Sequence, residues 1–276
     1  MLIISLSSIP PRFPKIGETL HCLLNQTVKA DRILLHIPQS YRRFPDWDGS
    51  LPRVPRGVEI VRVKQDYGPA TKVLPAARAF RGQDVDILFC DDDRIYAPDW
   101  AAVFVQARKS HPNACIATVA REASELFPSE QIRDHQPRAI QRRWITDIPF
   151  LLRYAGFEVK NRLWGGAEKP SRKVVMTPGY TDLFMGLGGV MVRPDHFDDV
   201  AYEIPGSHWM VDDIWLSGML ARAGVPIWTP ANVMQPNLAR AHFDSGLVDS
   251  QIGGLDRDTA DRNCYDFLRA TYGIWP

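Results

Sequence analysis

The chain has 276 residues, a formal net charge of +1, and a composition that is 45% hydrophobic and 24% charged. These values are ordinary for a globular protein, and the length suits one large α/β domain or two small ones. A net charge so close to zero gives no bulk attraction to nucleic acid or to an anionic membrane. We therefore expect no nucleic-acid partner.

The cysteines and the apolar runs indicate the cellular compartment of the protein. The four cysteines are scattered and form no Cys-x-x-Cys pair, which favours buried free thiols in a reducing compartment over a disulfide framework. The first nine residues are apolar but lack a basic leader, and no later window reaches the roughly eighteen apolar residues of a membrane span. A cytoplasmic location is the expectation.

The first part of the chain alternates predicted strands with a predicted helix. Strands are expected at 2–6, 32–37 and 58–63, and a helix with one apolar face at 16–24. This order predicts a parallel sheet with right-handed crossovers. Partial polar alternation in 58–63 favours a position nearer the sheet edge, and residues 39–56, rich in proline, read as an irregular excursion.

The remainder continues this alternation around one region of open interpretation. Residues 120–180, rich in arginine and tryptophan, are either a surface insertion with its cations lying along the protein or a functional region. A functional region would line a carbohydrate pocket or contact a phosphorylated or lipid-linked acceptor. The other predicted elements are helices at 70–80, 97–106, 212–223 and 259–272, and strands at 85–90, 114–119, 190–192 and 225–228.

Three consecutive carboxylates, Asp91, Asp92 and Asp93, follow the apolar run Val85–Cys90. The run is typical of a short strand buried on both faces. Adjacent negative charges repel one another and each is costly to desolvate, so the triplet is favourable at that position if a divalent cation binds there. A magnesium or manganese ion would in turn hold a diphosphate. A solvated acidic turn is the alternative.

Lys72 lies early in the predicted helix at 70–80. A lysine is unfavourable there because the positive end of the helix dipole favours anions. The conflict disappears if an anion docks at this end, since backbone amides and Lys72 would both face it. The segment is therefore a candidate phosphate contact close to the acidic triplet.

Asp212 and Asp213 form a second acidic group at the start of a predicted helix. Both are explained as helix caps, or one caps while its neighbour points into a cleft. Gly188 and Gly189 precede a short strand, where glycine permits either close backbone approach to a ligand or a bulge. The lone His242 is either structural or a ligand.

These signals, in this order, resemble bacterial GT-A-fold glycosyltransferases, close to the family-2-like enzymes that use nucleotide-sugar donors. The segments Asp66–Lys72 and Val211–Gly218 carry the resemblance most strongly, and it spans nearly the whole chain except 120–180. It implies an α/β fold of GT-A (Rossmann-like) type, with a mostly parallel sheet flanked by helices and a smaller acceptor-side region. One domain, 1–276, would comprise a nucleotide-sugar-binding half at 1–119, an insertion or acceptor-side region at 120–180, and a catalytic half at 181–276.

The resemblance also implies a role for each matching residue. Asp93 would bind the metal, with Asp91 near the ribose or the metal and His242 as a further ligand. Asp213 would be the general base, with Asp212 in place of the usual glutamate beside it. The residues that would contact the nucleotide sugar are Ser5, Ser7, Arg12, Asp66, Lys72, Asp91, Asp92, Gly188 and Gly189.

The implied activity is a metal-dependent, hexosyltransferase-like transfer. A sugar would move from a nucleotide-diphosphate donor, by default a UDP-sugar, to a hydroxyl of a glycan or lipid-linked acceptor in cell-surface polysaccharide biosynthesis. Inversion at the anomeric centre is the expectation, with retention on the same fold as the open alternative. Peripheral membrane association is also part of the expectation, and the cofactor would be Mn²⁺ or Mg²⁺. The chemistry fits independently, because a cation stabilises the departing diphosphate and a carboxylate takes the acceptor proton.

Two other functions remain open. A sugar-phosphate nucleotidyltransferase would carry a glycine-rich basic loop after the first strand, whereas this chain has Ser7–Arg12 there. A non-catalytic carbohydrate-binding relative is the second alternative, and the presence of both acidic groups argues against it.

Overall fold

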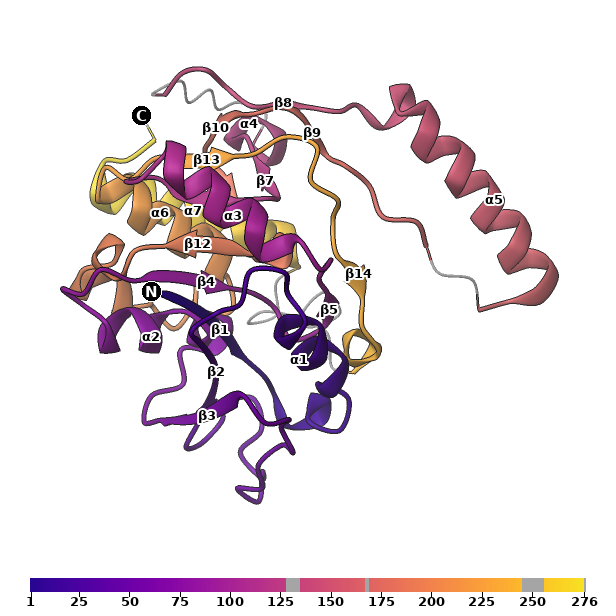
Figure 1. Ribbon diagram of the computed structural model, residues 1–276. Helices are drawn as coiled ribbons and strands as arrows, with labels where there is room; N and C mark the ends of the chain where they lie inside the picture. The colour runs from indigo at the N-terminus through magenta and orange to yellow at the C-terminus, as the bar shows by residue number, and fades with distance from the viewer. Residues whose placement is uncertain (128–134, 167–168, 245–255, 276) are drawn as a thin grey trace.

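The protein is built on a central eight-stranded sheet (Figure 1). The computed structural model describes residues 1–127, 135–166, 169–244 and 256–275. The strand order is β10-β13-β6-β12-β4-β1-β2-β3. The strands are β1 (Leu2–Ser7), β2 (Arg32–Pro38), β3 (Val58–Val63), β4 (Asp86–Phe89), β6 (Cys115–Ala117), β10 (Gly179–Thr181), β12 (Val190–Val192) and β13 (Ile227–Thr229).

Most of the sheet is parallel, as the strand–helix alternation predicted. The β1 strand pairs in parallel with β2 and β4, β2 with β3, and β13 with β6. The β12 strand lies antiparallel between β4 and β6, and β10 lies antiparallel to β13. The predicted place of β3 at a sheet edge is confirmed.

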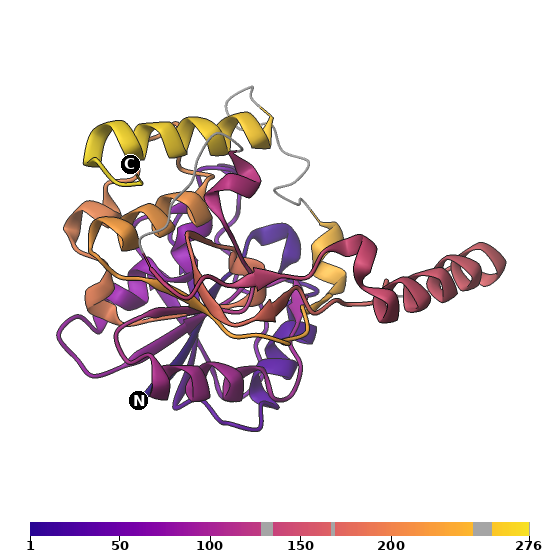
Figure 2. The ribbon, with the colours of Figure 1, turned by 90° about the horizontal axis from the view of Figure 1, so that it is seen from above.

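Helices cover both faces of this sheet (Figure 2). Strand residues alternate between two apolar clusters, so that Ile3 packs on one face and Ile4 on the other. The mixed α/β architecture, a mostly parallel sheet flanked by helices, is confirmed. One face holds α2 (Leu74–Ala79), α6 (Asp212–Arg222) and α7 (Arg257–Tyr272), and the other holds α1 (Gly17–Leu24) and α3 (Trp100–Ser110).

The prediction of one continuous helix at 70–80 is wrong. The chain forms a 3₁₀ helix, η2 (Gly68–Lys72), and then the separate helix α2. Pro75 accounts for the break, because proline has no amide hydrogen to donate to the preceding turn. The carbonyl end of η2 therefore turns toward β1, where Ser5 Oγ donates to the Lys72 carbonyl at 2.6 Å.

Residues 120–180 are joined to the body and also extend away from it. β10 is an edge strand of the central sheet, whereas α5 (Ile148–Trp164) projects outward in both ribbon views (Figures 1 and 2). Two-stranded pairs complete the fold, namely β5 (Arg94–Ile95) with β14 (Asn237–Leu238), β7 (Ala120–Arg121) with β11 (Leu183–Phe184), and β8 (Ile140–Gln141) with β9 (Val175–Thr177).

The shorter helices connect these strands. None of the helices in the described ranges combines the length and the apolar character needed to cross a membrane. The remaining helices are α4 (Ala123–Leu126) and the 3₁₀ turns η1 (Pro10–Arg12), η3 (Trp144–Thr146), η4 (Gly186–Gly188), η5 (Pro194–His196), η6 (Asp199–Tyr202) and η7 (Arg240–Phe243).

Candidate functional site

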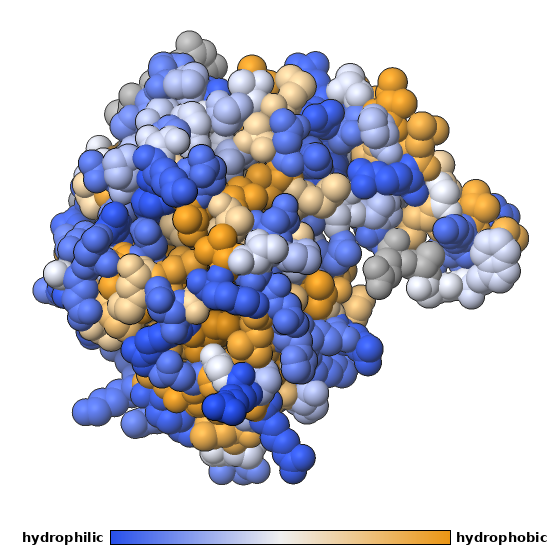
Figure 3. All heavy atoms as spheres, in the orientation of Figure 1, coloured by the Kyte–Doolittle hydropathy of each residue, from blue (hydrophilic) through white to orange (hydrophobic). Residues whose placement is uncertain are grey.

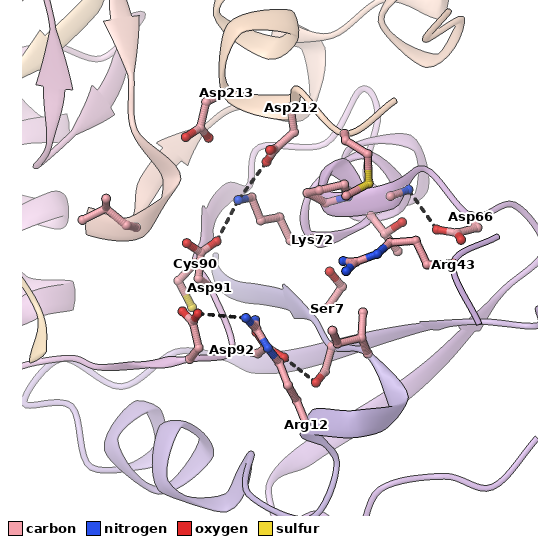
Figure 4. Close-up of a pocket in the computed structure, with 18 of the residues that line it drawn as sticks. Ser7, Arg12, Arg43, Asp66, Lys72, Cys90, Asp91, Asp92, Asp212 and Asp213 are labelled. Atoms are coloured by element: carbon pink, nitrogen blue, oxygen red, sulfur yellow. Dashed lines mark hydrogen bonds and ion pairs between the residues drawn. The ribbon is translucent and has the colours of Figure 1, made fainter. Parts of the chain in front are cut away.

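A cavity of about 320 Å³ lies where β1, β2 and β4 end. Ligands of open α/β sheets bind at the carboxyl ends of the strands, so the position is that of a ligand site. Both acidic groups face it, with Lys72 between them (Figure 4). The predicted site residues that line the cavity are Ser7, Arg12, Asp66, Lys72, Asp91, Asp92, Asp93, Asp212, Asp213 and His242.

The three consecutive aspartates take different partners. Asp91 Oδ1 accepts from Lys72 Nζ at 2.7 Å, whereas Asp92 faces Arg12 on the opposite side of the loop. Thr19 Oγ1 lies 2.9 Å from the carbonyls of both Asp92 and Arg94, which fixes the backbone between them. The triplet is therefore a rigid, paired structure and not a solvated turn.

Arg12 pairs with the last two aspartates of the triplet. Its Nη1 lies 2.6 Å from Asp92 Oδ1 and its Nη2 3.1 Å from Asp93 Oδ2. Ser8 Oγ also donates to Asp92. Burial nevertheless raises the pKa of Asp92 to about 6, although the charge of Arg12 opposes that rise.

Asp93 and His242 meet although they are far apart in the sequence. His242 Nδ1 lies 2.9 Å from Asp93 Oδ2. The pairing of β14 with β5 brings the two segments together, and the Ala239 amide donates to the Asp93 carbonyl at 2.9 Å. The predicted association of His242 with the last carboxylate of the triplet thus has a structural basis.

Lys72 joins the two acidic groups. Its ammonium lies 2.7 Å from Asp91 and 2.9 Å from Asp212. Burial disfavours the charged form, but Asp212 and Asp91 outweigh it and raise the pKa of Lys72 well above its ordinary value. Lys72 therefore stays cationic, and the same pairing holds the pKa of Asp91 below its ordinary value against the effect of burial.

Asp213 lies beside this pair, and no cation of the described residues forms an ion pair with it. Burial raises the pKa of Asp213 to about 7, and the charge of Asp212 adds to the rise while Lys72 opposes it. The Gly186 amide lies 3.1 Å from Asp213 Oδ1 and orients the carboxyl group. A carboxylate that titrates near neutral pH is suited to accept a proton.

The far end of the cavity is lined by Tyr41, Arg43 and Asp66. Asp66 accepts the amides of Arg42 and Gly68, each at 2.8 Å. Burial raises the pKa of Asp66. A flat polar ring would find an aromatic side chain, a cation and a fixed carboxyl group here.

Three predicted nucleotide contacts lie behind the cavity and do not line it. Ser5 is fully buried in β1 and holds the Lys72 carbonyl. The Gly188 carbonyl accepts from Trp100 Nε1 at 2.8 Å, and Gly189, at φ +88°, lies against the same indole. The direct donor contact predicted for these residues stays a prediction, whereas Gly186, which touches Asp213, was not assigned a role from the sequence.

Other lining residues were also missed by sequence reasoning. Tyr41 and Arg43 lie in the stretch 39–56 that appeared irregular, and Trp209 and Arg257 lack any local motif. The Trp209 indole donates to the Asp66 carbonyl at 3.0 Å. The only signal in the sequence was the pairing of an aromatic and a cation in Tyr41–Arg43, within a segment otherwise rich in turn residues.

The side chains around Asp93 fit a hydrated cation that is shared with a phosphate. Within the described ranges, no three His, Cys, Asp or Glu side chains gather closely enough to enclose a metal. Magnesium-type ions, however, use one or two carboxylates and complete their shell with waters and substrate phosphates. Asp93 Oδ1 is buried without a hydrogen-bond partner in the described part of the chain and lies 3.4 Å from Arg94 Nε. Asp93 and His242 are thus a suitable pair of ligands.

Comparison with known proteins gives weak similarities only. No family model matches the chain, and neither does any curated protein. The chain is similar to the structure of S. aureus TarS 1–349 in complex with UDP, with 9% identity over 85% of this chain and 59% of that one, at a TM-score of 0.42. A second structure of S. aureus TarS gives 9% identity, 85% and 35% coverage, and a TM-score of 0.39. The chain thus spans less than two thirds of either, and neither similarity defines its activity.

Proposed function

We propose that the protein is a nucleotide-sugar-dependent glycosyltransferase. The observation that carries this proposal is the meeting of the two acidic groups, 91–93 and 212–213, around Lys72 at the carboxyl ends of the central strands. One group is suited to a leaving diphosphate and the other to an attacking hydroxyl. A glycosyl transfer needs both within one cavity.

The leaving diphosphate would lie against Lys72 and Arg12. Both cations are already oriented by carboxylates, so no reorganisation is needed as negative charge develops on the leaving group. Asp93 and His242 would hold a Mn²⁺ or Mg²⁺ ion, whose chemistry is to neutralise that charge as a Lewis acid. Asp91 would then orient Lys72 in addition to any contact with the ribose.

The acceptor hydroxyl would lose its proton to Asp213. An alcohol is essentially un-ionised at neutral pH, so a positioned base is required. Asp213 has a pKa near 7, is held by the Gly186 amide, and makes no ion pair in the described part of the chain. Asp212, bound to Lys72, is committed to charge balance. If the attack comes from the Asp213 side, opposite the diphosphate, the anomeric centre inverts.

The nucleoside would occupy the end lined by Tyr41, Arg43 and Asp66. A uridine diphosphate sugar, with a hexose as the donated group, is the proposed donor. The proposed acceptor is a hydroxyl of a glycan or of a lipid-linked saccharide, in cell-surface polysaccharide biosynthesis at the cytoplasmic side of the membrane.

Turnover of a panel of nucleotide sugars, with and without Mn²⁺, tests the proposal. The variants are Asp93→Asn and Asp213→Asn, and the matched control is Asp99→Asn, an exposed aspartate whose side chain makes no cap hydrogen bond. We expect Asp213→Asn to lose roughly a hundredfold or more in kcat while nucleotide binding persists. Asp93→Asn should lose both turnover and the response to Mn²⁺, and the control should match wild type.

Full turnover by Asp213→Asn, relative to the Asp99→Asn control, would overturn the assignment of the base. Formation of a nucleotide sugar from a nucleoside triphosphate and a sugar 1-phosphate would support a nucleotidyltransferase instead. Nucleotide binding without transfer or hydrolysis of any donor would support a non-catalytic relative.

A further inference from the structure

The helix α5 carries an unpartnered apolar face. Within the described part of the chain, fourteen large apolar side chains are exposed, and seven of them lie between residues 144 and 164. A soluble monomer rarely gathers so many in one place unless the surface is used. Figure 3 shows apolar surface on the projecting arm, residues 142–173, which includes α5.

The outward face of α5 is a continuous stripe. Ile148, Leu152, Val159 and Leu163 recur at spacings of four, seven and four residues, which puts them on one side of the helix. Their exposed fractions are 65%, 71%, 57% and 63%.

A different face of the same helix packs inward. Phe150 is 4% exposed and forms an aromatic row with Tyr154 and Phe157, at centroid distances of 5.7 and 5.6 Å. Arg172 lies over the Phe150 ring, and Lys169 over the Tyr154 ring. These contacts join α5 to the segment that follows it, and the stripe takes no part in them.

Basic side chains border the stripe. Helix geometry places Arg153 and Lys160 along one of its edges and Arg162 along the other, and all three are exposed. Over 142–173 the sequence has eight Lys or Arg and three Asp or Glu, a net charge of +5, whereas the whole chain carries +1 and the remainder therefore −4. The near-neutral total conceals a strongly basic arm.

Tryptophans stand at both ends of the arm. Trp144 precedes the helix with 53% of its surface exposed, and Trp164 closes it with 77% exposed. An indole has an apolar body and a polar N–H, and it is favoured at the boundary between lipid and water.

From these features we propose that α5 binds the surface of an anionic lipid bilayer. The helix would lie in the interface plane, with the stripe inserted among the acyl chains and Arg153, Lys160 and Arg162 against the headgroups. At 17 residues the helix is about 25 Å long and carries charges, which suits the plane of the interface.

The positive charge of the arm favours an anionic lipid surface over a second copy of this chain as the partner of the stripe. Two arms packed stripe to stripe would bring two regions of +5 together, and like charges at close range oppose association. An anionic bilayer supplies the opposite charge along the whole length of the arm.

Co-flotation of the full chain with vesicles tests this inference. One set of vesicles is phosphatidylcholine alone and the other also contains phosphatidylglycerol. We expect binding to the anionic set that weakens at high salt, and weaker binding to the neutral set. Lys160→Gln and Arg162→Gln should each lower the affinity about fivefold.

The double variant Leu152→Gln/Leu163→Gln should bind at least about tenfold less well. Its matched control is Leu51→Gln, the same change at an exposed leucine outside the arm (45% exposed), which should bind like wild type. All substituted side chains are exposed, so thermal unfolding should be unchanged in each variant.

Absence of wild-type binding to anionic vesicles would overturn the inference, as would equal binding by the double variant and the Leu51→Gln control. Self-association that the double variant abolishes, without vesicle binding, would identify the stripe as an interface between copies and would also overturn it. Vesicle binding requires neither donor nor turnover, so its outcome is independent of the proposed transferase activity.

Discussion

The adjacent aspartates 212 and 213 differ in what each one faces. Asp212 is ion-paired with the buried Lys72, whereas Asp213 accepts only a backbone amide among the described contacts. The pKa of Asp213 rises to about 7 because burial and the charge of Asp212 disfavour its ionised form. In the proposed mechanism these two neighbouring carboxylates take separate roles, Asp212 as a fixed counter-charge and Asp213 as a proton acceptor.

This difference predicts the pH dependence of catalysis. The base works only when deprotonated, so kcat/KM for the proposed transfer should rise about tenfold per pH unit below pH 7 and level off above it. The dependence of kcat/KM on pH reports groups of the free enzyme, the state in which Asp213 has this pKa.

The variant Asp212→Asn tests the cause of that pKa. Removing the Asp212 charge removes a contribution that raises the pKa of Asp213. The rising limb of the plot of kcat/KM against pH should therefore move to lower pH. The Asp99→Asn control should leave the limb in place. A limb that stays put or moves to higher pH in Asp212→Asn would contradict the assignment of Asp213 as the base.

The buried His36 lowers the stability of the folded protein at acid pH. It is 1% exposed in β2, and neither ring nitrogen has a hydrogen-bond partner in the described part of the chain. Burial lowers the pKa of His36 to about 4. Below pH 6.5 the unfolded chain takes up a proton that the folded chain does not, so stability falls as the pH drops from 6.5 to 4.

Replacing His36 by leucine should remove this loss of stability at acid pH. For His36→Leu we expect an unfolding free energy equal to or above that of wild type at pH 7, because no unpaired nitrogen stays buried. At pH 5 the advantage should grow by about 2 kcal/mol, as the 1.5-unit gap to the unfolded pKa implies. Urea unfolding at both pH values measures it, and an advantage that shrinks toward pH 5 would refute the account.

At the scale of elements, η4 sets the position of Asp213, the proposed base. A Cβ on Gly186 would lie 2.6 Å from Lys72 Nζ and 3.0 Å from Asp213 Oδ1. Lys72 is held by its ion pairs with Asp91 and Asp212, so the added methyl group must displace it or push Asp213 aside. Gly186→Ala should lower kcat by about a hundredfold, the usual consequence of an ångström-scale misplacement, with a smaller effect on stability.

Gly156→Ala is the control for this prediction. Nothing lies within 4 Å of a Cβ at Gly156 in α5, and alanine is the better helix former. This variant should keep full activity and gain up to about 1 kcal/mol in unfolding free energy. Equal kcat values for the two variants would mean that η4 does not position the catalytic pair.

Local patterns predicted most elements because strands and helices depend on neighbours close in the sequence. The strand expected at 58–63 has those same bounds, and the one at 85–90 is shortened to Asp86–Phe89. The helix at 70–80 failed because the effect of Pro75 outweighed the apolar spacing around it. The two-residue pairing of β5 with β14 leaves no periodic signal at all.

The candidate site was predictable in position but not in pairing. A buried strand that ends in carboxylates identifies the location of a charged site. The pairing of Asp91 with Lys72 depends on a contact between residues 19 apart in the sequence. The nearness of Asp93 to His242, 149 residues away, was expected only from the resemblance to a family and not from any local pattern. Such contacts are set by the register of the whole sheet and by the loop after β4. Tyr41 and Arg43 were missed for the same reason, since they enter the cavity from an irregular segment.

At the scale of the whole molecule, the body and the arm carry net charges of opposite sign. The cavity holds both acidic groups with the cations that pair with them and lies within a body whose sequence carries −4, whereas residues 142–173 carry +5. A bilayer-bound arm would hold the enzyme where a lipid-linked acceptor is found, and the cavity would receive its donor from solution. The two proposals are compatible, and each stands on its own contacts.

Crystals soaked with uridine diphosphate and Mn²⁺ test the central claim most directly, because the anomalous signal locates the ion independently of the nucleotide. We predict the ion within coordination distance of Asp93 and His242, the diphosphate against Lys72, and the base beside Tyr41 and Asp66. An ion and a nucleotide bound outside this cavity, or a cavity that binds neither, would contradict the account.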